Sequence, residues 1–385
     1  MSLFLTLITL SSLGLIVYHY LLYPLLLVAL RLVAASPVLR APVTPSVSIL
    51  IAAHNEAGII ARKLETTLAL DYPQPQIILS SDGSTDATAE IARRYAASGV
   101  EVIESAERGG KGRALNRAAA AARGDILLIS DANAFPEPDA LRRLAEYFAD
   151  PAVGCVSGAV SARTDADRPS PVAGSEGLYW RYEGFIKQSE SAIASATGVV
   201  GSLLAIRREL FEPVPEGVVN DDSHLMHAVL RQGRRSIYAP EARAWRLPSR
   251  SAADERGRRA RIAAGRWQHL TRRDAWPLRS PMTVFFLLSH KFLRLLLPVL
   301  MALALVGNAL LVPLGGLTAL TTLTLLGQLG FYALAGYGWW LERGGRRSKL
   351  PMLAYFVLNG SIATAHGLLR HLRGAQSVLW AKAER

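Results

Sequence analysis

Hydrophobic residues follow two different patterns along the chain. Leucine-rich runs without charge occur near both ends: residues 3–30 carry no formal charge, and no charged residue occurs in residues 295–341. A helix needs about 20 apolar residues to cross a membrane, so the first run predicts one span. Pro313, Gly315 and Gly316 divide the second run into two halves, each of which is long enough to span.

The flanks of these runs set the limits of the predicted membrane regions. Residues 281–294 mix phenylalanine and leucine with His290, Lys291 and Arg294, which is typical of a helix lying at the membrane interface. Residues 351–369 form a weaker apolar stretch, which predicts either a further span or a re-entrant segment. We expect an N-terminal anchor over residues 1–34 and an interfacial helix with a transmembrane region over residues 281–385, with spans near 292–312, 317–341 and 351–369.

In the central part of the chain the apolar runs are shorter than those near the two ends. Brief apolar runs alternate with alanine-rich helical stretches, and this alternation predicts a mostly parallel, Rossmann-like α/β sheet with helices on both faces. The predicted strands are residues 47–53, 76–81, 100–104 and 125–130, and the predicted helices are residues 58–70, 85–97 and 111–123. We assign residues 41–275 to this domain.

Positive charge beside the spans predicts their orientation. Arg31 and Arg40 follow the first span, and residues 343–349 carry four basic side chains. Such residues gather on the cytoplasmic side, so we expect residues 41–275 to face the cytoplasm. The first run lacks a basic leader and a small-residue cleavage site, which favours a retained anchor. With an alanine- and arginine-rich composition typical of a GC-rich bacterial genome, the chain is predicted to be a multi-pass protein of the bacterial inner membrane.

Composition narrows the function classes. The formal net charge is +12, which is compatible with nucleic acid, anionic lipid or a phosphorylated substrate as partner. No nucleic-acid recognition motif is visible and the basic residues gather beside the apolar runs, so we expect membrane lipid and no nucleic acid as partner. Cys155 is the only cysteine, which excludes an intrachain disulfide. The uncharged residues 295–341 argue against a transporter.

Acidic side chains follow three of the predicted strands. Glu56, Asp82 and Asp131 come directly after them, and ligands bind at the carboxyl ends of strands in such sheets. Taken singly, residues 82–86 also fit a turn with a helix cap, and residues 131–133 fit an Asx turn. Their convergence on one edge predicts a nucleotide site.

A glycine-rich basic segment lies between the third and fourth strands. In residues 108–116, the glycines permit close approach to a ligand and Lys111 is placed to pair with phosphate at a helix N-terminus. Ser105 and Arg113 break the Walker A spacing, so this is not a P-loop. A basic surface loop is the alternative interpretation.

These motifs, in this order along residues 45–275, resemble family 2 glycosyltransferases of the GT-A fold. The resemblance is to the membrane-embedded group related to cellulose, hyaluronan and poly-N-acetylglucosamine synthases. The matching segments are Ala53-His54-Asn55-Glu56, Ser81-Asp82-Gly83-Ser84-Thr85-Asp86, Lys111 to Asn116, Asp131-Ala132-Asn133, Asn220-Asp221-Asp222 and Arg258-Arg259-Ala260-Arg261-Ile262.

The resemblance implies a role for each matched residue. Asp222 corresponds to the catalytic base, with Asp221 beside it, and a divalent cation (Mg²⁺ or Mn²⁺) would bind Asp131 and Asn133. The implied nucleotide-binding residues are Ala53, Asn55, Glu56, Asp82, Lys111, Asp131 and Arg261. Adjacent acids at 221 and 222 also suit the start of a helix, and the arginines near Arg258 also suit a face against anionic lipid.

The matched motifs depart from the family pattern at three positions. Ser81 replaces the first aspartate of the second motif, and Asn133 replaces the second carboxylate of the metal motif, which weakens the hold on a hard cation. Ile262 stands where the family has a tryptophan associated with the acceptor sugar of processive polymerases; Trp267 lies five residues on.

The resulting functional expectation is an inverting glycosyltransferase. It would move a sugar from a nucleotide-diphosphate sugar, expected to be a UDP-sugar, to a polysaccharide or lipid-linked acceptor at the cytoplasmic membrane face. One alternative is single-sugar transfer to polyisoprenyl phosphate or another lipid. An alternative of a different class is a non-catalytic nucleotide-binding membrane sensor. The sequence leaves the donor sugar, the acceptor, partner subunits and oligomeric state open.

Overall fold

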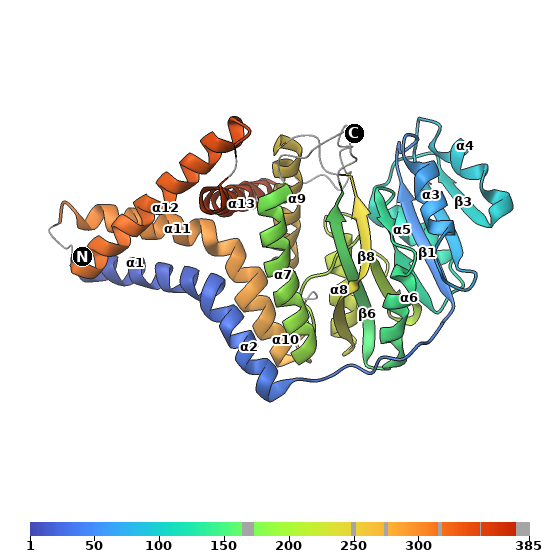
Figure 1. Cartoon of the computed structure of the whole chain (residues 1–385), viewed down its shortest axis with the longest axis horizontal. Coiled ribbons are helices and arrows are strands. Elements are labelled where there is room, and N and C mark those ends of the chain that lie inside the picture. Colours follow the sequence, from blue (N-terminus) through green and yellow to red (C-terminus); the bar gives the residue numbers. More distant parts are fainter. Residues whose placement is uncertain (164–172, 248–251, 273–275, 315–317, 347, 375–385) are drawn as a thin grey trace.

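The computed structural model describes residues 1–163, 173–247, 252–272, 276–314, 318–346 and 348–374. Its shape is elongated, with a group of long helices at one end and a sheet with its covering helices at the other (Figure 1). Two helices, α7 (Ala173–Ile193) and α9 (Ala252–Thr271), lie between these parts. The sheet and the long helices therefore meet through α7 and α9.

Eight strands of the described residues form one sheet in the order β3-β2-β1-β4-β7-β6-β8-β5. The first four strands along the chain pair in parallel, whereas β7 runs antiparallel to both β4 and β6. The strands are β1 Val47–Ala53, β2 Gln76–Asp82, β3 Val100–Ser105, β4 Ile126–Ile129, β5 Ala134–Pro136, β6 Val153–Ala162, β7 Leu204–Arg207 and β8 Arg235–Arg246. The four predicted strands are confirmed within two residues at each end.

Strand β1 shows why both faces of the sheet are covered. All seven of its residues are buried, because alternate side chains enter different cores. Ile49 and Ile51 belong to one core, whereas Leu50 and Ala52 belong to the other. The covering helices are α3 (Ile60–Leu68), α4 (Thr88–Arg93), α5 (Lys111–Ala120), α6 (Ala140–Ala145) and α8 (Asp221–Arg231). The predicted α/β class, a mostly parallel sheet between helices, is confirmed.

Four helical runs of the described residues are long and apolar enough to cross a membrane: Ser2–Ala34, Pro281–Leu311, Ala319–Arg343 and Lys349–Leu372. The first run joins α1 (Ser2–Val17), a π-helical turn (Tyr18–Leu22) and α2 (Tyr23–Ala34). The third and fourth are α12 and α13. The fourth is unbroken, which favours a span over the re-entrant alternative.

The run Pro281–Leu311 is one continuous helical segment. It joins α10 (Pro281–Phe286), a π-helical turn (Leu287–Phe292) and α11 (Leu293–Leu311), so residues 281–294 continue directly into α11, and their position at a membrane interface stays a prediction. His290 and Lys291 are buried rather than exposed to headgroups. The sequence suggested an interfacial helix because these polar residues look misplaced in a span until α7 supplies their partners.

Candidate active site

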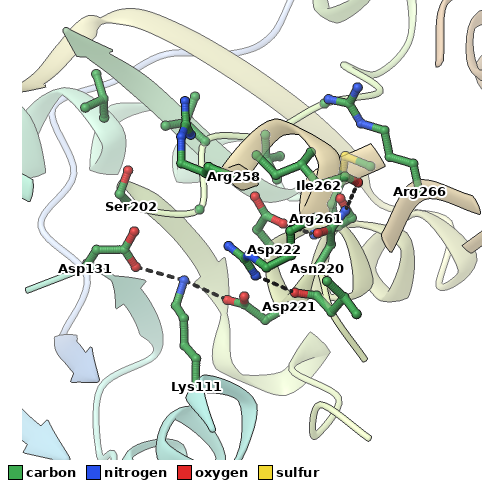
Figure 2. A pocket seen from close by; sticks show the side chains of 18 of the residues that line it. Lys111, Asp131, Ser202, Asn220, Asp221, Asp222, Arg258, Arg261, Ile262 and Arg266 are labelled. Atoms are coloured by element: carbon green, nitrogen blue, oxygen red, sulfur yellow. Dashed lines mark hydrogen bonds and ion pairs between the residues drawn. The ribbon is translucent and has the colours of Figure 1, made fainter. Parts of the chain in front are cut away.

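A cavity of about 1820 Å³ lies between the sheet edge, α7, α9 and the run Pro281–Leu311. Its walls include the cluster of charged side chains in Figure 2, contributed by the start of α5, the segment after β4, the start of α8 and helix α9. Residues far apart in the sequence therefore share one chamber, as the convergence of strand ends predicts.

Lys111 lies at the centre of the charged cluster. Its ammonium group is 2.8 Å from Asp131 Oδ1 and 2.9 Å from Asp221 Oδ2, and Figure 2 shows it between the two carboxylates. Burial alone would lower the pKa of Lys111, but the two carboxylates outweigh burial and raise it. The lysine is thus held as a cation, and it is the first residue of α5 after Gly110, whose φ of 90° suits glycine.

The two predicted metal ligands lie together on the cavity wall. Asp131 and Asn133 both line it. Burial favours a raised pKa for Asp131, but Lys111 and then Lys63 reverse the effect and lower it, so the carboxylate stays ionised. A carboxylate and an amide oxygen are ligand types that Mg²⁺ or Mn²⁺ accepts. Among the described residues no three acidic, histidine or cysteine side chains gather to hold a metal, so a cation here needs further oxygens from the donor diphosphate.

Lys63 supports this segment from beneath, and the sequence analysis missed it. Its fully buried ammonium group donates to Ser130 Oγ (2.5 Å) and to the carbonyl oxygen of Ala134 (2.6 Å), and so fixes both ends of the segment that carries Asp131. Burial lowers the pKa of Lys63 to about 7. Its signal was present: Lys63 lies on the same apolar helical face as Leu64, where a charge needs a reason.

The predicted catalytic base, Asp222, and its acidic neighbour Asp221 lie at the start of helix α8. Asn220 is the N-cap and Asp221 and Asp222 form the first turn. Burial, together with the neighbouring Asp222 carboxylate, raises the pKa of Asp221 although Lys111 opposes this. Asp222 packs on Gly201, where an added Cβ would come within 2.6 Å of the aspartate Cβ, so a glycine is needed for Asp222 to reach the cavity. The helix-start and catalytic interpretations are therefore compatible.

Helix α9 brings the predicted arginine to the same chamber. Arg261 lines the cavity and donates to the carbonyl oxygen of Val219 at 3.3 Å. Asn220 donates to the carbonyl oxygen of Ile262 at 3.0 Å, which ties α9 to the start of α8 (Figure 2). Arg258 also lines the cavity, so the alternative in which it faces only lipid does not fit its position.

Asp82 does not line the cavity. Its carboxylate is fully buried and accepts hydrogen bonds from the amides of Gly109 (3.0 Å) and Gly110 (2.6 Å) and from Arg117 (2.8 Å). These bonds shape the loop that leads into Lys111. The Asp82 carboxylate thus contacts the protein's own backbone, and its contact with the nucleoside stays a prediction.

The residues of the first-strand motif, Ala53 to Glu56, also lie in different surroundings. Glu56 lines the cavity, whereas Ala53 and Asn55 do not. Ala53 is fully buried. Asn55 Oδ1 instead accepts from the amide of Thr85 at 2.7 Å, and Asn55 adopts a φ of 54°. The motif thus joins the ends of β1 and β2 and leaves Glu56 as its member facing the chamber.

Comparison with known proteins decides the family. Residues 48–214 match the family model "Glycosyl transferase family 2". These residues form a family 2 glycosyltransferase domain. The matched range holds β1 to β7 and includes Lys111 and Asp131.

Relatives of known name are similar to this glycosyltransferase domain over part of their length. The poly-beta-1,6-N-acetyl-D-glucosamine synthase of Staphylococcus aureus (strain MSSA476) is 26% identical over 231 residues, covering 59% of this chain and 56% of that protein. The beta-monoglucosyldiacylglycerol synthase of Synechocystis is 34% identical over 118 residues, covering 29% and 25%. The chain thus spans a little over half of the first relative.

A solved structure shares the fold along nearly the whole chain. The mannosyltransferase PcManGT from Pyrobaculum calidifontis, in complex with GDP-Man and Mn²⁺, superposes with a TM-score of 0.71 at 23% identity, covering 96% of this chain and 100% of that one. The superposition therefore extends beyond the GT-A domain to the long apolar helices, and the predicted fold class is confirmed.

Proposed function

We propose that the protein is an inverting glycosyltransferase that uses a nucleotide-diphosphate sugar, with a UDP-sugar as the expected donor. The observation that carries the proposal is the cluster of Lys111, Asp131, Asp221 and Asp222 in one cavity. The first two of these residues lie within the family 2 match of residues 48–214. The acceptor is a polysaccharide or a lipid-linked glycan at the cytoplasmic face of a bacterial inner membrane. In this arrangement residues 1–34 and 281–385 anchor the catalytic domain of residues 41–275.

The leaving group is the first requirement of the reaction. Lys111 and Arg261 line the chamber as cations, and each would pair with oxygens of the donor diphosphate. Asp131 and Asn133 would hold a divalent cation, which when bound neutralises charge developing on the leaving diphosphate. The lowered pKa of Asp131 supports this role, because the ligand remains an anion at neutral pH.

The acceptor hydroxyl is the second requirement. Asp222 accepts its proton while the hydroxyl oxygen forms a bond to the anomeric carbon, and the bond from that carbon to the diphosphate oxygen breaks. The nucleoside diphosphate leaves from the opposite face, so an α-linked donor yields a β-glycoside. Asp222 Oδ1 accepts from the amide of Ser223 at 2.7 Å, which fixes the orientation of the carboxylate.

Processive synthesis is not required by the residues at the acceptor side. Ile262 lines the cavity where processive polymerases of the resembling group carry a tryptophan, and an isoleucine cannot stack on a sugar ring as an aromatic does. Trp267 lies on the same helix, but among the described residues it is not part of the cavity lining. Transfer of a single sugar fits these residues better than polymerisation.

The test is nucleotide release from a panel of UDP- and GDP-sugars by the purified full-length protein with Mg²⁺ or Mn²⁺. We expect cation-dependent release, and a fall of roughly 10²–10⁴-fold in Asp222→Asn with nucleotide affinity retained, because the base is lost and the donor contacts are not. Asp139→Asn, on the exposed surface, is the matched control. Undiminished release in Asp222→Asn would refute the assignment of the base. Absence of any nucleotide binding would refute the function, whereas binding without release would favour the sensor.

A further inference from the structure

The cavity continues from the charged cluster toward the long apolar helices. Its far end is lined by Lys187 from α7 and by Leu287, Lys291 and Phe292 from the run Pro281–Leu311. The two lysines are only 6% and 7% exposed. Burying an ammonium group is costly, and the donor site does not account for two lysines at this end of the chamber.

The nearby carboxylates are already engaged. Glu183 accepts from Arg294 and lies 3.5 Å from Lys291 Nζ. Glu190 is within 3.0 Å of His290 Nδ1 and accepts at 2.8 Å from the Tyr23 hydroxyl. These bonds join α7 to both apolar runs and leave the acids little further capacity.

Lys187 stands apart from this network. Among the described residues no carboxylate lies within ion-pair distance of its ammonium group, which instead lies 5.0 Å from the ring centre of Tyr238. Burial lowers the pKa of Lys187, and the positive charge of Arg266 adds to this, although Glu183 opposes it. A bound anion would supply the missing partner.

A glycine lies directly against the two lysines. A Cβ built on Gly198 would lie 2.8 Å from Lys291 Nζ and 3.9 Å from Lys187 Cε. Gly198 itself lines the cavity. The two lysine side chains thus flank one glycine, and the space beside it would be closed by any larger residue.

The position of this end of the cavity indicates what kind of anion fits. Asp222 packs on Gly201, three residues along the chain from the glycine that the two lysines flank. All of these residues line the cavity, and Asp222 also adjoins the charged cluster around Lys111 (Figure 2), so the proposed base lies near both ends. Leu287 and Phe292, at the same end, belong to a run apolar enough to cross a membrane. A molecule reaching from Asp222 past the lysines toward this run needs a hydroxyl, an anionic group and an apolar part in that order.

We propose that Lys187 and Lys291 bind the phosphate or diphosphate group of a membrane-lipid acceptor, whose head-group hydroxyl reaches Asp222. The inference rests on the proposed function and deepens it, because it assigns the acceptor class and the residues that recognise it. Phosphate pairs well with ammonium groups, and the lipid chain would lie along the apolar helices.

The experiment measures binding of a polyisoprenyl phosphate, which carries the anionic and apolar parts of the proposed acceptor without its hydroxyl, to the full-length protein in phosphatidylcholine nanodiscs. The corresponding polyisoprenol is the uncharged control ligand. The wild type is expected to bind the phosphate and not the alcohol. Lys187→Met should weaken binding roughly tenfold or more, as expected for loss of a charged hydrogen bond, whereas Lys187→Arg should retain it. Lys349→Met, an exposed lysine, is the matched control.

A second variant keeps the proposal testable if Lys187→Met does not fold. Gly198→Val keeps both charges but crowds Lys291, and it should also weaken binding of the lipid phosphate. Nucleotide affinity, measured in the same samples, should be unchanged in both variants. Wild-type failure to bind nucleotide would overturn the proposed function, whereas intact nucleotide binding with equal lipid-phosphate affinity in wild type and Lys187→Met would overturn this inference alone.

Inorganic phosphate is the probe that separates a lipid from a soluble source. If it binds in a Lys187-dependent way and competes with the lipid phosphate, the shared site is supported. If inorganic phosphate binds in a Lys187-dependent way but the lipid phosphate does not bind, the proposal of a membrane lipid is refuted. The acceptor would then be a soluble phosphorylated molecule.

Discussion

Lys111 and Lys187 line the same cavity, yet their surroundings are opposite. Lys111 lies within 2.9 Å of two carboxylates, and these raise its pKa. The Lys187 ammonium group lies 5.0 Å from the ring centre of Tyr238, and burial lowers the pKa of Lys187. One lysine thus belongs to a finished ion-pair cluster, whereas the other is a buried cation that the described residues do not neutralise.

With the proposed donor and acceptor, this difference would let one chamber bind two charged substrates at separate ends. At the donor end acidic groups accompany the lysine, which suits a diphosphate that arrives with a divalent cation. At the other end the uncompensated positive charge suits an anion that arrives without one. The proposed base, Asp222, packs on Gly201 near the lysine end and adjoins the Lys111 cluster, and so lies where the two substrates would meet.

Among the substitutions that test this comparison, the largest expected effect is that of Lys111→Met. Removal of the ammonium group leaves Asp131 and Asp221 facing each other without a counter-charge and removes a contact to the leaving diphosphate. Transfer should fall roughly 10²–10³-fold, and affinity for the nucleotide sugar should fall with it, as measured by single-turnover kinetics and titration. If Lys111→Met binds donor as well as Lys349→Met does, the donor end has been assigned to the wrong lysine and the comparison fails.

Asp82→Asn tests whether the loop before Lys111 is held from beneath. The change removes the charge that Gly109, Gly110 and Arg117 contact, and it should lower the free energy of unfolding by about 1.5–3 kcal/mol. Chemical denaturation of the full-length protein, followed by a signal from the α/β domain, measures this change in the free energy of unfolding. The exposed pair of Asp139 with Arg143 is the control, and Asp139→Asn should cost no more than about 1 kcal/mol. Equal losses in the two variants would contradict the structural role of Asp82.

The smallest effect on stability is expected for Lys187→Met. This substitution should stabilise the protein, whereas Asp82→Asn should destabilise it. A buried lysine whose folded pKa is lowered destabilises the fold while it is charged, so its removal should raise the unfolding midpoint by a few degrees at neutral pH. The advantage should shrink as pH rises toward the ordinary lysine value of 10.5, where the wild-type lysine also loses its proton. The charged or titratable groups facing it are Glu183, Glu190, Asp222, Tyr238, Arg266 and Lys291.

Thermal unfolding at neutral and alkaline pH measures this prediction. A lower midpoint for Lys187→Met than for wild type at neutral pH would show that Lys187 is already neutralised in the free protein. In that case the two lysines would not differ as described.

Local pattern was enough to predict most of the fold. The strand at residues 47–53 was predicted with its observed bounds, because a short β-rich apolar run ending in polar residues has few other solutions. The helix starting at Asp221 followed from acids at its first turn. The antiparallel strand β7 between β4 and β6 was not predicted, since strand order depends on contacts between distant segments.

The site was predictable to the same degree. Lys111, Asp131 and Asp222 lie at strand and helix ends, where sequence order and sheet geometry together place them. The contacts of Asp82 with the amides of Gly109 and Gly110 were not predicted, because nothing in the sequence shows that these amides turn toward it. Lys187 and Lys291 were missed because their meeting depends on how α7 docks against a helix a hundred residues away.

The helical run from Pro281 to Leu311 also gives the bilayer a mechanical influence on the chemistry. Lys291 lies in a π-helical turn, and Pro298 follows within the same run; both features are places where helices bend. A helix that meets a bilayer of unsuitable thickness responds by tilting or kinking. Any such adjustment would move Lys291 relative to Asp222, so lipid chain length becomes a variable that tunes acceptor alignment without touching the donor site.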